Sequence, residues 1–510
     1  MLFNINSLNY ICFVFAFIIL FFLSSNIGKA QSIVIALGNA FYILVTSGVK
    51  ALFVVSSLVL FVYCIAHLIN KYKDRNLIIV ARILLYGGVL ATLGILLYFK
   101  FFIKSFELVR DFLLLHSITI SSLIVPIGFS YYTLSLVGYL VDVYHGKHAP
   151  EDSFICFFGF ATFFPAIIQG PINLYREFGT QIKSIHFPEY NRIVQGLQRS
   201  LWGYIKKVVI ADRIGIIVNN ILTDSEATGF LLLWGMILYG FQIYADFSGG
   251  IDVIMGISET LGFNLKENFR FPLLAGSVTE FWKKWHISLG DFMEKYVYYP
   301  IVLNHKIVKF SKKIRNKYLQ RCMSATIASI VVFVIVGIWH GTGWNYVIYG
   351  CYQAFFVSSA ILFAPVYKSM KKRIRLNEDC ISWKFFTIAR TVFLLTIGRY
   401  FIKATNITNT FGMLERTFMY PSIKRWNIII DGTLTGYGLD YKNLVMMYLG
   451  IFMLIAIDIL HSRKIEIRKL IMSQDVVFRF AVNIAAILFL IVFGIYGPGF
   501  DKASYIYESF

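Results

Sequence analysis

Acidic side chains are scarce in this sequence, and charge as a whole is low. Only 15% of the 510 residues are charged, and 28 aspartates and glutamates stand against 48 lysines and arginines, for a formal net charge of +20. Soluble domains carry charge on roughly a quarter of their residues. This chain is instead 57% hydrophobic, with a mean hydropathy of +0.67. These values exclude an ordinary soluble globular protein and indicate a membrane protein.

Motifs for metal and phosphate binding are missing as well. The six cysteines never occur as Cys-x-x-Cys, and no His-x-x-x-His occurs, although these spacings are typical of zinc sites. No glycine-rich segment has the P-loop pattern of nucleotide-binding proteins. We also find no internal repeat and no low-complexity linker. The sequence therefore predicts no metal site and no bound cofactor, and we expect residues 1–510 to form a single membrane-embedded domain.

Long apolar runs recur along the whole chain, and a run of about 18 or more residues is long enough to cross a bilayer core. The candidate spans are residues 8–25, 32–48, 50–69, 77–100, 112–142, 153–170, 229–247, 323–340, 344–365, 384–402, 443–461 and 478–497. Residues 194–222 are expected to be amphipathic or broken, because charged residues from Lys206 to Arg213 interrupt them, and 250–263 is a weak apolar piece. The expected fold is all-α and polytopic, with about 11–13 spans and additional re-entrant or interfacial helices.

The basic residues are concentrated in two short loops. Residues 306–321 contain seven lysines and arginines and no acidic residue, and residues 368–375 contain five basic residues. Such clusters mark the cytoplasmic side of a membrane protein and favour anionic lipid. The alternative is a docking site for an acidic carrier protein or a nucleotide. Two apolar runs separate the loops, so they are predicted to form a hairpin whose turn, residues 340–343, lies away from the cytoplasm.

Residues 264–300 are too polar to span a membrane, yet they are dense in aromatic side chains. Within them, residues 279–289 read Thr-Glu-Phe-Trp-Lys-Lys-Trp-His-Ile-Ser-Leu. Phe281, Trp282 and Trp285 would share one face of a helix. We therefore predict a helical segment that is either re-entrant, with its polar groups surrounded by protein or water, or interfacial, with its aromatics at headgroup depth.

Two histidines are candidates for chemistry. His340 ends an apolar run, and an ionisable side chain inside a membrane segment is a functional candidate. Neutral imidazole can accept the proton of an alcohol that attacks an acyl carbon. No serine or cysteine stands at nucleophile-elbow spacing near His340, and no aspartate completes a triad, so direct acyl transfer fits better than a covalent acyl-enzyme. The alternative is that His340 and His286 only bond carbonyl groups across helices.

Two carboxylates, Asp246 and Asp252, lie at the end of an apolar run. Intramembrane acids face a bundle interior or a cavity, and we favour a packing network around a reaction chamber. The competing class is a transporter or flippase in which these aspartates are coupling sites. That class predicts broken helices in two similar halves, and the sequence shows no such repeat.

Taken in order, these motifs resemble the membrane-bound O-acyltransferase family, most strongly over residues 120–350. They are Phe-Pro and Gly-Pro-Ile within 164–172, Lys-Lys at 206–207, Asp-Phe-Ser-Gly at 246–249, Asn-Phe at 268–269, the block at 279–289 and Trp-His-Gly at 339–341. The branch that looks nearest is the alginate O-acetyltransferase type, whose neighbour is the teichoic-acid D-alanyl transfer protein.

The resemblance implies a ring of tilted helices around a central funnel or tunnel, with the acyl donor approaching from the cytoplasm and the hydroxyl acceptor from outside. His340 matches the family's catalytic histidine, and His286 matches its second characteristic histidine. The positions expected to line or support the tunnel are Trp282, Trp285, Ser288, Trp339, Asp246 and Asn268.

The function expected from these observations is O-acyl transfer in the inner (cytoplasmic) cell membrane, by a multi-pass protein. The acyl group, first of all acetyl, would come from a cytoplasmic thioester, either acetyl-CoA or an acyl-carrier protein. It would pass to hydroxyls of an exported polysaccharide, with a separate extracytoplasmic acyl-transfer protein and membrane lipids as further partners and no nucleic acid. D-alanyl transfer to teichoic acid from a carrier protein is the second candidate.

Overall fold

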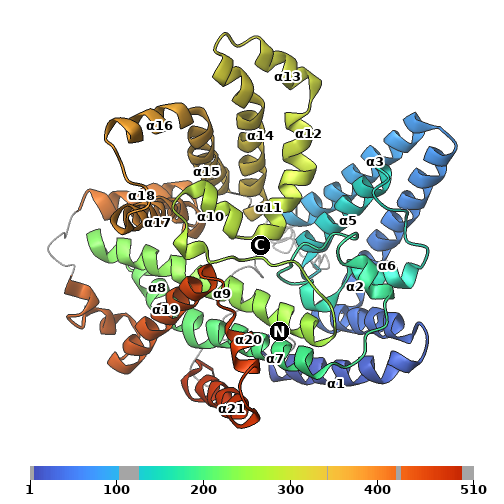
Figure 1. Ribbon diagram of the computed structural model, residues 1–510, viewed down its shortest axis with the longest axis horizontal. Helices are drawn as coiled ribbons and strands as arrows, with labels where there is room; N and C mark the ends of the chain where they lie inside the picture. The colour runs from blue at the N-terminus through green and yellow to red at the C-terminus, as the bar shows by residue number, and fades with distance from the viewer. Residues whose placement is uncertain (1–4, 103–125, 342, 421–426, 497–510) are drawn as a thin grey trace, which may run out of the picture. The chain divides into compact units, whose positions relative to one another are not determined.

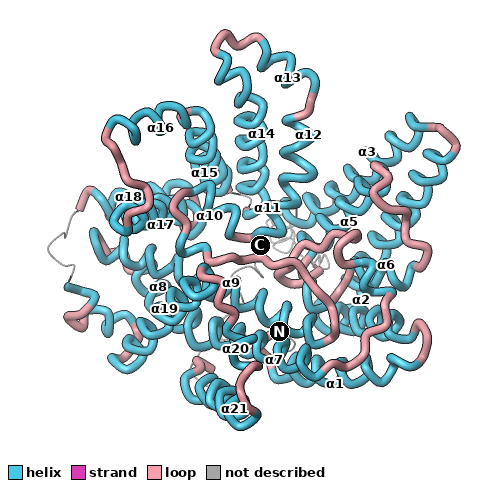
Figure 2. Tube along the Cα trace, in the orientation of Figure 1, coloured by secondary structure: helices cyan, strands magenta, loops and turns pink. Residues whose placement is uncertain are grey.

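The computed structural model describes residues 5–102, 126–341, 343–420 and 427–496. Over these ranges the ordered elements are helices and no strand is present (Figure 2). The described chain packs as two compact units. One contains the residues up to Gly203 together with Gly250–Lys266, and the other contains Tyr204–Gly249 and the residues from Glu267 onward. The expectation of a single domain stays a prediction.

Eight helices in the described ranges are long and apolar enough to cross a membrane. They are Leu8–Asn26, which is α1 (Leu8–Leu23) with the turn that follows it, α2 (Ala30–Asp74), Ile78–Lys100, which begins with α3 (Ile78–Leu97), α9 (Gly229–Thr260), α14 (Lys317–His340), α17 (Ile381–Lys403), α19 (Tyr441–Ser462) and α21 (Val476–Phe493). The bent pair α15 (Trp344–Leu362) and α16 (Ala364–Arg373), which meet at 64°, makes a ninth if it counts as one broken span. The chain is therefore a multi-pass, all-helical membrane protein, as predicted.

The first unit is built on α2, which α3, α5 (Phe129–Tyr144) and α6 (Phe154–Ala161) contact (Figure 1). Within α2, the two expected spans at 32–48 and 50–69 are separate helical stretches that meet at Gly48, whose φ of 81° and ψ of 173° are not helical and suit a residue without a Cβ. The expected span at 153–170 is wrong as a single helix. It consists of the short α6 and a buried irregular segment, because the amide of Asn39 bonds Gly159, Thr162 and the backbone N–H of Phe164. Of the expected span at 112–142, residues 112–125 lie outside the described residues.

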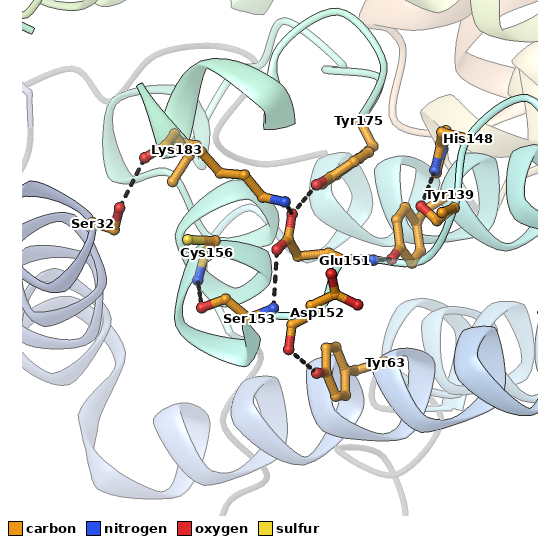
Figure 3. Close-up of polar contacts among 12 residues, drawn as sticks. Ser32, Tyr63, Tyr139, His148, Glu151, Asp152, Ser153, Cys156, Tyr175 and Lys183 are labelled. Atoms are coloured by element: carbon orange, nitrogen blue, oxygen red, sulfur yellow. Dashed lines mark hydrogen bonds and ion pairs between the residues drawn. The ribbon is translucent and has the colours of Figure 1, made fainter. Parts of the chain in front are cut away.

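A buried carboxylate holds the loop between α5 and α6 (Figure 3). Glu151 is 2% exposed and accepts hydrogen bonds from the ammonium of Lys183 at 2.7 Å, from the backbone N–H of Ser153 at 2.9 Å and from the hydroxyl of Tyr175. Its own backbone N–H donates to the Tyr139 hydroxyl at 2.7 Å. Since every partner comes from a different point of the chain, this carboxylate ties the loop to the rest of the first unit.

The remaining helices of the first unit and the start of the second follow one another without a loop. α7 (Tyr190–Tyr204), the π-helical turn η5 (Ile205–Ala211) and α8 (Asp212–Thr223) form a continuous helical run. The expected interruption at 194–222 is therefore a π-helical turn rather than a chain break. The pieces expected at 229–247 and 250–263 are likewise one helix, α9.

The second unit contains a hairpin of α14 and α15, which run side by side (Figure 1). A Cβ on Gly337 would lie 2.5 Å from the carbonyl oxygen of Tyr346, and a Cβ on Gly350 would lie 2.4 Å from that of Phe333. Only glycine permits this approach. The other helices of the second unit are α10 (Val278–Lys284), α11 (Ile287–Met293), α12 (Tyr299–Val302), α13 (His305–Lys312), α18 (Ile407–Phe418) and α20 (Ile467–Met472).

Candidate functional site

The chain breaks its helical course at Trp285 and His286, between α10 and α11. His286 has a φ of 49°, in the left-handed region that side chains other than glycine rarely adopt. Trp285 is extended and forms an isolated antiparallel bridge with Phe269. The expectation of one helical face through Phe281, Trp282 and Trp285 is therefore wrong, because the helix ends at Lys284.

Asn268 holds this break in place. Its backbone carbonyl accepts the N–H of Ile287 at 3.0 Å, and its side-chain Oδ1 accepts the N–H of Ser288 at 2.9 Å. The first amides of a helix have no partner within that helix, so Asn268 supplies from another segment what an N-cap residue normally supplies. Asn268 is fully buried. One side chain thus fixes the start of α11 and, with it, the backbone of His286.

His286 is 2% exposed and surrounded by aromatic rings. Its imidazole packs in an edge-to-face arrangement with Phe247, at a centroid distance of 4.9 Å, and with Trp339, at 6.0 Å. Burial, followed by the nearby charge of His340, lowers the pKa of His286 to about 3. A neutral imidazole at physiological pH follows, able to donate through one nitrogen and accept through the other.

His340 is the last residue of α14 and is 4% exposed. Its ring lies 5.3 Å from that of Trp339 and 6.1 Å from that of Tyr349 on α15. Trp339 therefore contacts both histidines, so residues 54 positions apart in the sequence share one aromatic enclosure. The predicted hairpin turn is present, since α14 ends at His340 and α15 begins at Trp344.

The turn after His340 is fastened to α17. The side-chain amide of Asn345, 1% exposed, donates to the carbonyl of Phe401 at 2.9 Å and to that of Ala404 at 3.1 Å. These carbonyls belong to the last turn and C-cap of α17. The far ends of α14 and α17 are therefore at one level, remote from the basic segments that precede α14 and follow α15.

A cavity of about 420 Å³ lies beside His286. Its lining combines polar side chains from the α10–α11 region with an apolar wall from α14 and α15: the former are Lys283, His286, Asp291 and Glu294, and the latter Val332, Phe333, Val336 and Val357. On α14, the lining residue Val336 lies one helical turn before His340. The volume is that of a small-molecule pocket.

The other residues predicted for the site either line the cavity or contact residues next to His286. Trp282 lines the cavity and donates its indole N–H to Oε1 of Gln353 at 3.1 Å. Trp285 stacks on Phe281 with centroids 5.3 Å apart, and Ser288 offers its backbone N–H to Asn268. Both residues therefore position His286, while Trp282 and Trp339 lie beside the histidines or the cavity.

Asp246 does not belong to the described cavity. Its carboxylate pairs with Lys207 at 2.7 Å, and the same ammonium pairs with Asp212 at 2.8 Å. Asp252 in the first unit pairs with Arg199 at 2.9 Å. Paired carboxylates of this kind fit the packing network that the sequence suggested. The connection of Asp246 to the site is through its neighbour Phe247, which contacts His286.

Four contacting residues were missed in the sequence: Phe247, Tyr349, Gln353 and Asn345. Phe247 could have been found, because it sits inside the Asp-Phe-Ser-Gly motif. Tyr349 and Gln353 are four residues apart in an apolar run, a spacing that puts two polar groups on one helical face. Nothing in the sequence shows that Asn345 reaches α17.

Among the residues with described positions, no three histidine, cysteine, aspartate or glutamate side chains gather as a metal-binding group. Two buried imidazoles, a tryptophan between them and an adjoining cavity with an apolar wall can bind an acyl group and accept a proton in a water-poor setting.

Residues 147–398 match the model of the membrane-bound O-acyltransferase family. A probable alginate O-acetylase of Pseudomonas syringae pv. tomato is 27% identical over 71% of this chain and 65% of its own length. A peptidoglycan O-acetyltransferase of Helicobacter pylori is 31% identical over 55% of this chain and 54% of its own. A teichoic acid D-alanyltransferase of Bacillus subtilis is 29% identical over 46% of this chain and 58% of its own. In each case the match spans less than two thirds of the relative.

Proposed function

Residues 147–398 are a domain of the membrane-bound O-acyltransferase family, and on this premise we propose that the protein is an O-acyltransferase of the cytoplasmic membrane. It transfers a small acyl group, acetyl, from a cytoplasmic thioester to hydroxyls of an exported cell-surface polysaccharide. The observation that carries the proposal is the pair of buried histidines around Trp339, with His340 at the end of α14. Relatives named for O-acetylation of alginate and of peptidoglycan support acetyl as the group.

In the proposed reaction His340 is the general base. The acceptor oxygen attacks the thioester carbonyl carbon while His340 takes the hydroxyl proton, which forms the new carbon–oxygen bond. Collapse of the tetrahedral intermediate breaks the carbon–sulfur bond, and the departing sulfur receives the proton from the imidazolium. An ester and a free thiol result, with no covalent acyl-enzyme. In this proposal His286, whose backbone Asn268 fixes, donates a hydrogen bond to the developing oxyanion.

The donor is assigned to the cytoplasmic side. Basic side chains precede α14 at residues 306–321 and follow α15 at 368–375, and the cavity runs between these helices and α10–α11. Acetyl-CoA and acyl-carrier proteins are both anionic, so either is attracted to this side. The cavity then receives the thioester arm, and an extracytoplasmic partner protein that completes transfer to the polymer belongs to the same proposal.

A second candidate is D-alanyl transfer to teichoic acid. One observation favours it beyond the relative of that name: Asp291 and Glu294 line the cavity and could face the ammonium of a D-alanyl group. An acetyl group has no such charge.

The test is mass analysis of cell-surface polymers from cells with and without this protein. Acetyl esters that disappear in its absence support the first proposal, and D-alanyl esters that disappear support the second. Surface polymers with unchanged ester content would contradict both.

A further inference from the structure

Arg399 is a cation inside a membrane span that the proposed reaction does not use. It lies on α17, one turn before the helix ends at Lys403. Its guanidinium makes one side-chain hydrogen bond, from Nη1 to the Thr396 hydroxyl at 3.2 Å. Within the described ranges it forms no ion pair with a carboxylate. A charged side chain at such a position is costly unless it meets an opposite charge.

The guanidinium of Arg399 packs against Gly240 of α9, a position that we call the arginine seat. A Cβ placed on Gly240 would lie 2.2 Å from Nη1 and 2.4 Å from Cζ of Arg399. The group therefore lies directly against the backbone of α9, and any larger residue at 240 would displace it. On α17 the preceding residue, Gly398, also lies close to α15, since a Cβ there would be 2.9 Å from Nε2 of Gln353. Arg399 is thus directed between α9 and α15 rather than outward to lipid.

The seat adjoins the histidine site. A Cβ on Gly398, the residue before Arg399, would lie 3.4 Å from Cε2 of Tyr349, and the Tyr349 ring is 6.1 Å from that of His340. One turn further along α17, the Lys403 ammonium lies 5.2 Å from the centroid of the Tyr239 ring and donates to Oδ1 of Asn219 at 3.0 Å. Two cations therefore lie at the His340 end of α17, and their hydrogen-bond partners among the described residues are neutral.

We propose that Arg399, assisted by Lys403, binds an anionic group of the acceptor, a carboxylate or a phosphate, beside His340. This inference rests on the proposed function and narrows its substrate class to acidic polymers. A guanidinium presents paired donors that match either anion in a bidentate arrangement. The donor's phosphates are the poorer occupant, because α17 runs from the basic 368–375 segment toward the opposite end. A lipid phosphate is also the poorer occupant, because the guanidinium of Arg399 packs against Gly240 of α9 and is not directed toward the surrounding lipid.

The test measures binding to the His340→Ala protein in nanodiscs, so that no acyl transfer occurs. The probes are a uronic-acid oligosaccharide, its methyl ester, which is neutral, and a glycerol-phosphate oligomer. The parent should bind one of the acidic probes more tightly than the ester, and Arg399→Gln should weaken that binding about tenfold or more while leaving the ester unchanged. Arg399→Lys should retain part of the affinity. The exposed Arg463→Gln removes the same charge elsewhere and should change nothing.

Gly240→Ala provides a second variant that keeps the arginine and fills its seat, and it should also weaken acidic binding. Equal affinity of the parent for acidic and neutral probes would overturn the inference, as would an Arg399→Gln effect that follows the anionic lipid content of the nanodisc instead of the probe. Enzyme with His340 intact separates the two proposals. Arg399→Gln should raise KM for the acidic acceptor with little change in kcat. Intact acidic binding without any acyl transfer would sink the proposed function and leave the anion site standing.

Discussion

At the scale of single residues, the backbone of His286 depends on contacts from another segment of the chain. His286 occupies a backbone conformation that costs of order 1–3 kcal/mol for a non-glycine residue, so surrounding contacts must compensate for that energy. Asn268 supplies two of them, through its carbonyl and its side-chain oxygen. The orientation of His286 is therefore set from a segment almost twenty positions away.

Replacing Asn268 tests this dependence. Asn268→Ala removes the acceptor for the Ser288 N–H and should lower the free energy of unfolding by about 1 kcal/mol, the usual value of a helix cap. It should lower acyl transfer by more than that stability loss explains, since His286 moves with the start of α11. Thermal unfolding and transfer rate measure the two effects. Asn406→Ala, which removes the cap of α18, should cost similar stability with the rate unchanged, and equal rates in the two variants would contradict the role of Asn268.

Glu151 gives the clearest pH dependence. Burial by itself raises the pKa of Glu151, but the hydrogen bonds from Lys183, Tyr175 and Ser153 outweigh burial, and the pKa falls below its ordinary value. A carboxyl whose pKa is lower in the folded state stabilises that state above its unfolded pKa. The contribution disappears as pH falls through the folded pKa.

The expected result is a fall in the thermal midpoint of the wild-type protein below about pH 5. Glu151→Gln should be less stable than wild type at pH 7 and should lose less stability on acidification. Glu466 serves as the control, since it pairs with Lys469 on the surface, where both side chains are more than half exposed. Glu466→Gln should leave the profile unchanged. A Glu151→Gln profile that parallels wild type would refute the assignment.

At the scale of elements, the α14–α15 hairpin carries His340 and one wall of the cavity. Its close packing relies on Gly337 and Gly350, where a Cβ would collide with a carbonyl oxygen of the facing helix. Helix pairs in membranes associate through small residues of this kind. The distance between His340 and Tyr349 thus follows from two glycines lower in the hairpin.

Gly337→Val should therefore push the two helices apart. Overpacking of this sort costs about 1–3 kcal/mol, and transfer activity should fall with the midpoint of thermal unfolding. Gly87→Val on α3 is the matched control, because a Cβ there meets nothing within 4 Å and the residue is exposed. If Gly337→Val unfolded and reacted like wild type, the close approach would have no part in holding the site.

The elements also show what sequence could predict. The lengths of the apolar runs and the positions of the two basic loops were enough to predict the helices α14 and α15 and the turn after His340. These features depend only on the free energy of moving apolar and charged side chains between water and the membrane. The break at Trp285 was not predictable from helical periodicity, since it depends on backbone bonds to Asn268 and Arg270. The contact between Arg399 and Gly240 could not be predicted either, because the two residues are about 160 positions apart and no local sequence pattern marks them as neighbours.

At the scale of the whole molecule, the basic segment 306–321 lies at the start of α14 and His340 lies at its end. α14 has 24 residues, so its two ends are about 36 Å apart at 1.5 Å per residue. That length is close to the thickness of a bilayer core. The proposed reaction therefore joins a cytoplasmic thioester to a hydroxyl that arrives from the far side, with the transfer at the imidazole.

The most direct test of this account is acyl transfer by His340→Ala in proteoliposomes supplied with an acyl thioester and a hydroxyl acceptor. Loss of the general base should lower the rate about 100-fold to 10,000-fold, while the variant inserts and unfolds like wild type. His461→Ala, an exposed histidine at the end of α19, should transfer normally. A His340→Ala protein that transfers the acyl group at the wild-type rate would contradict the account.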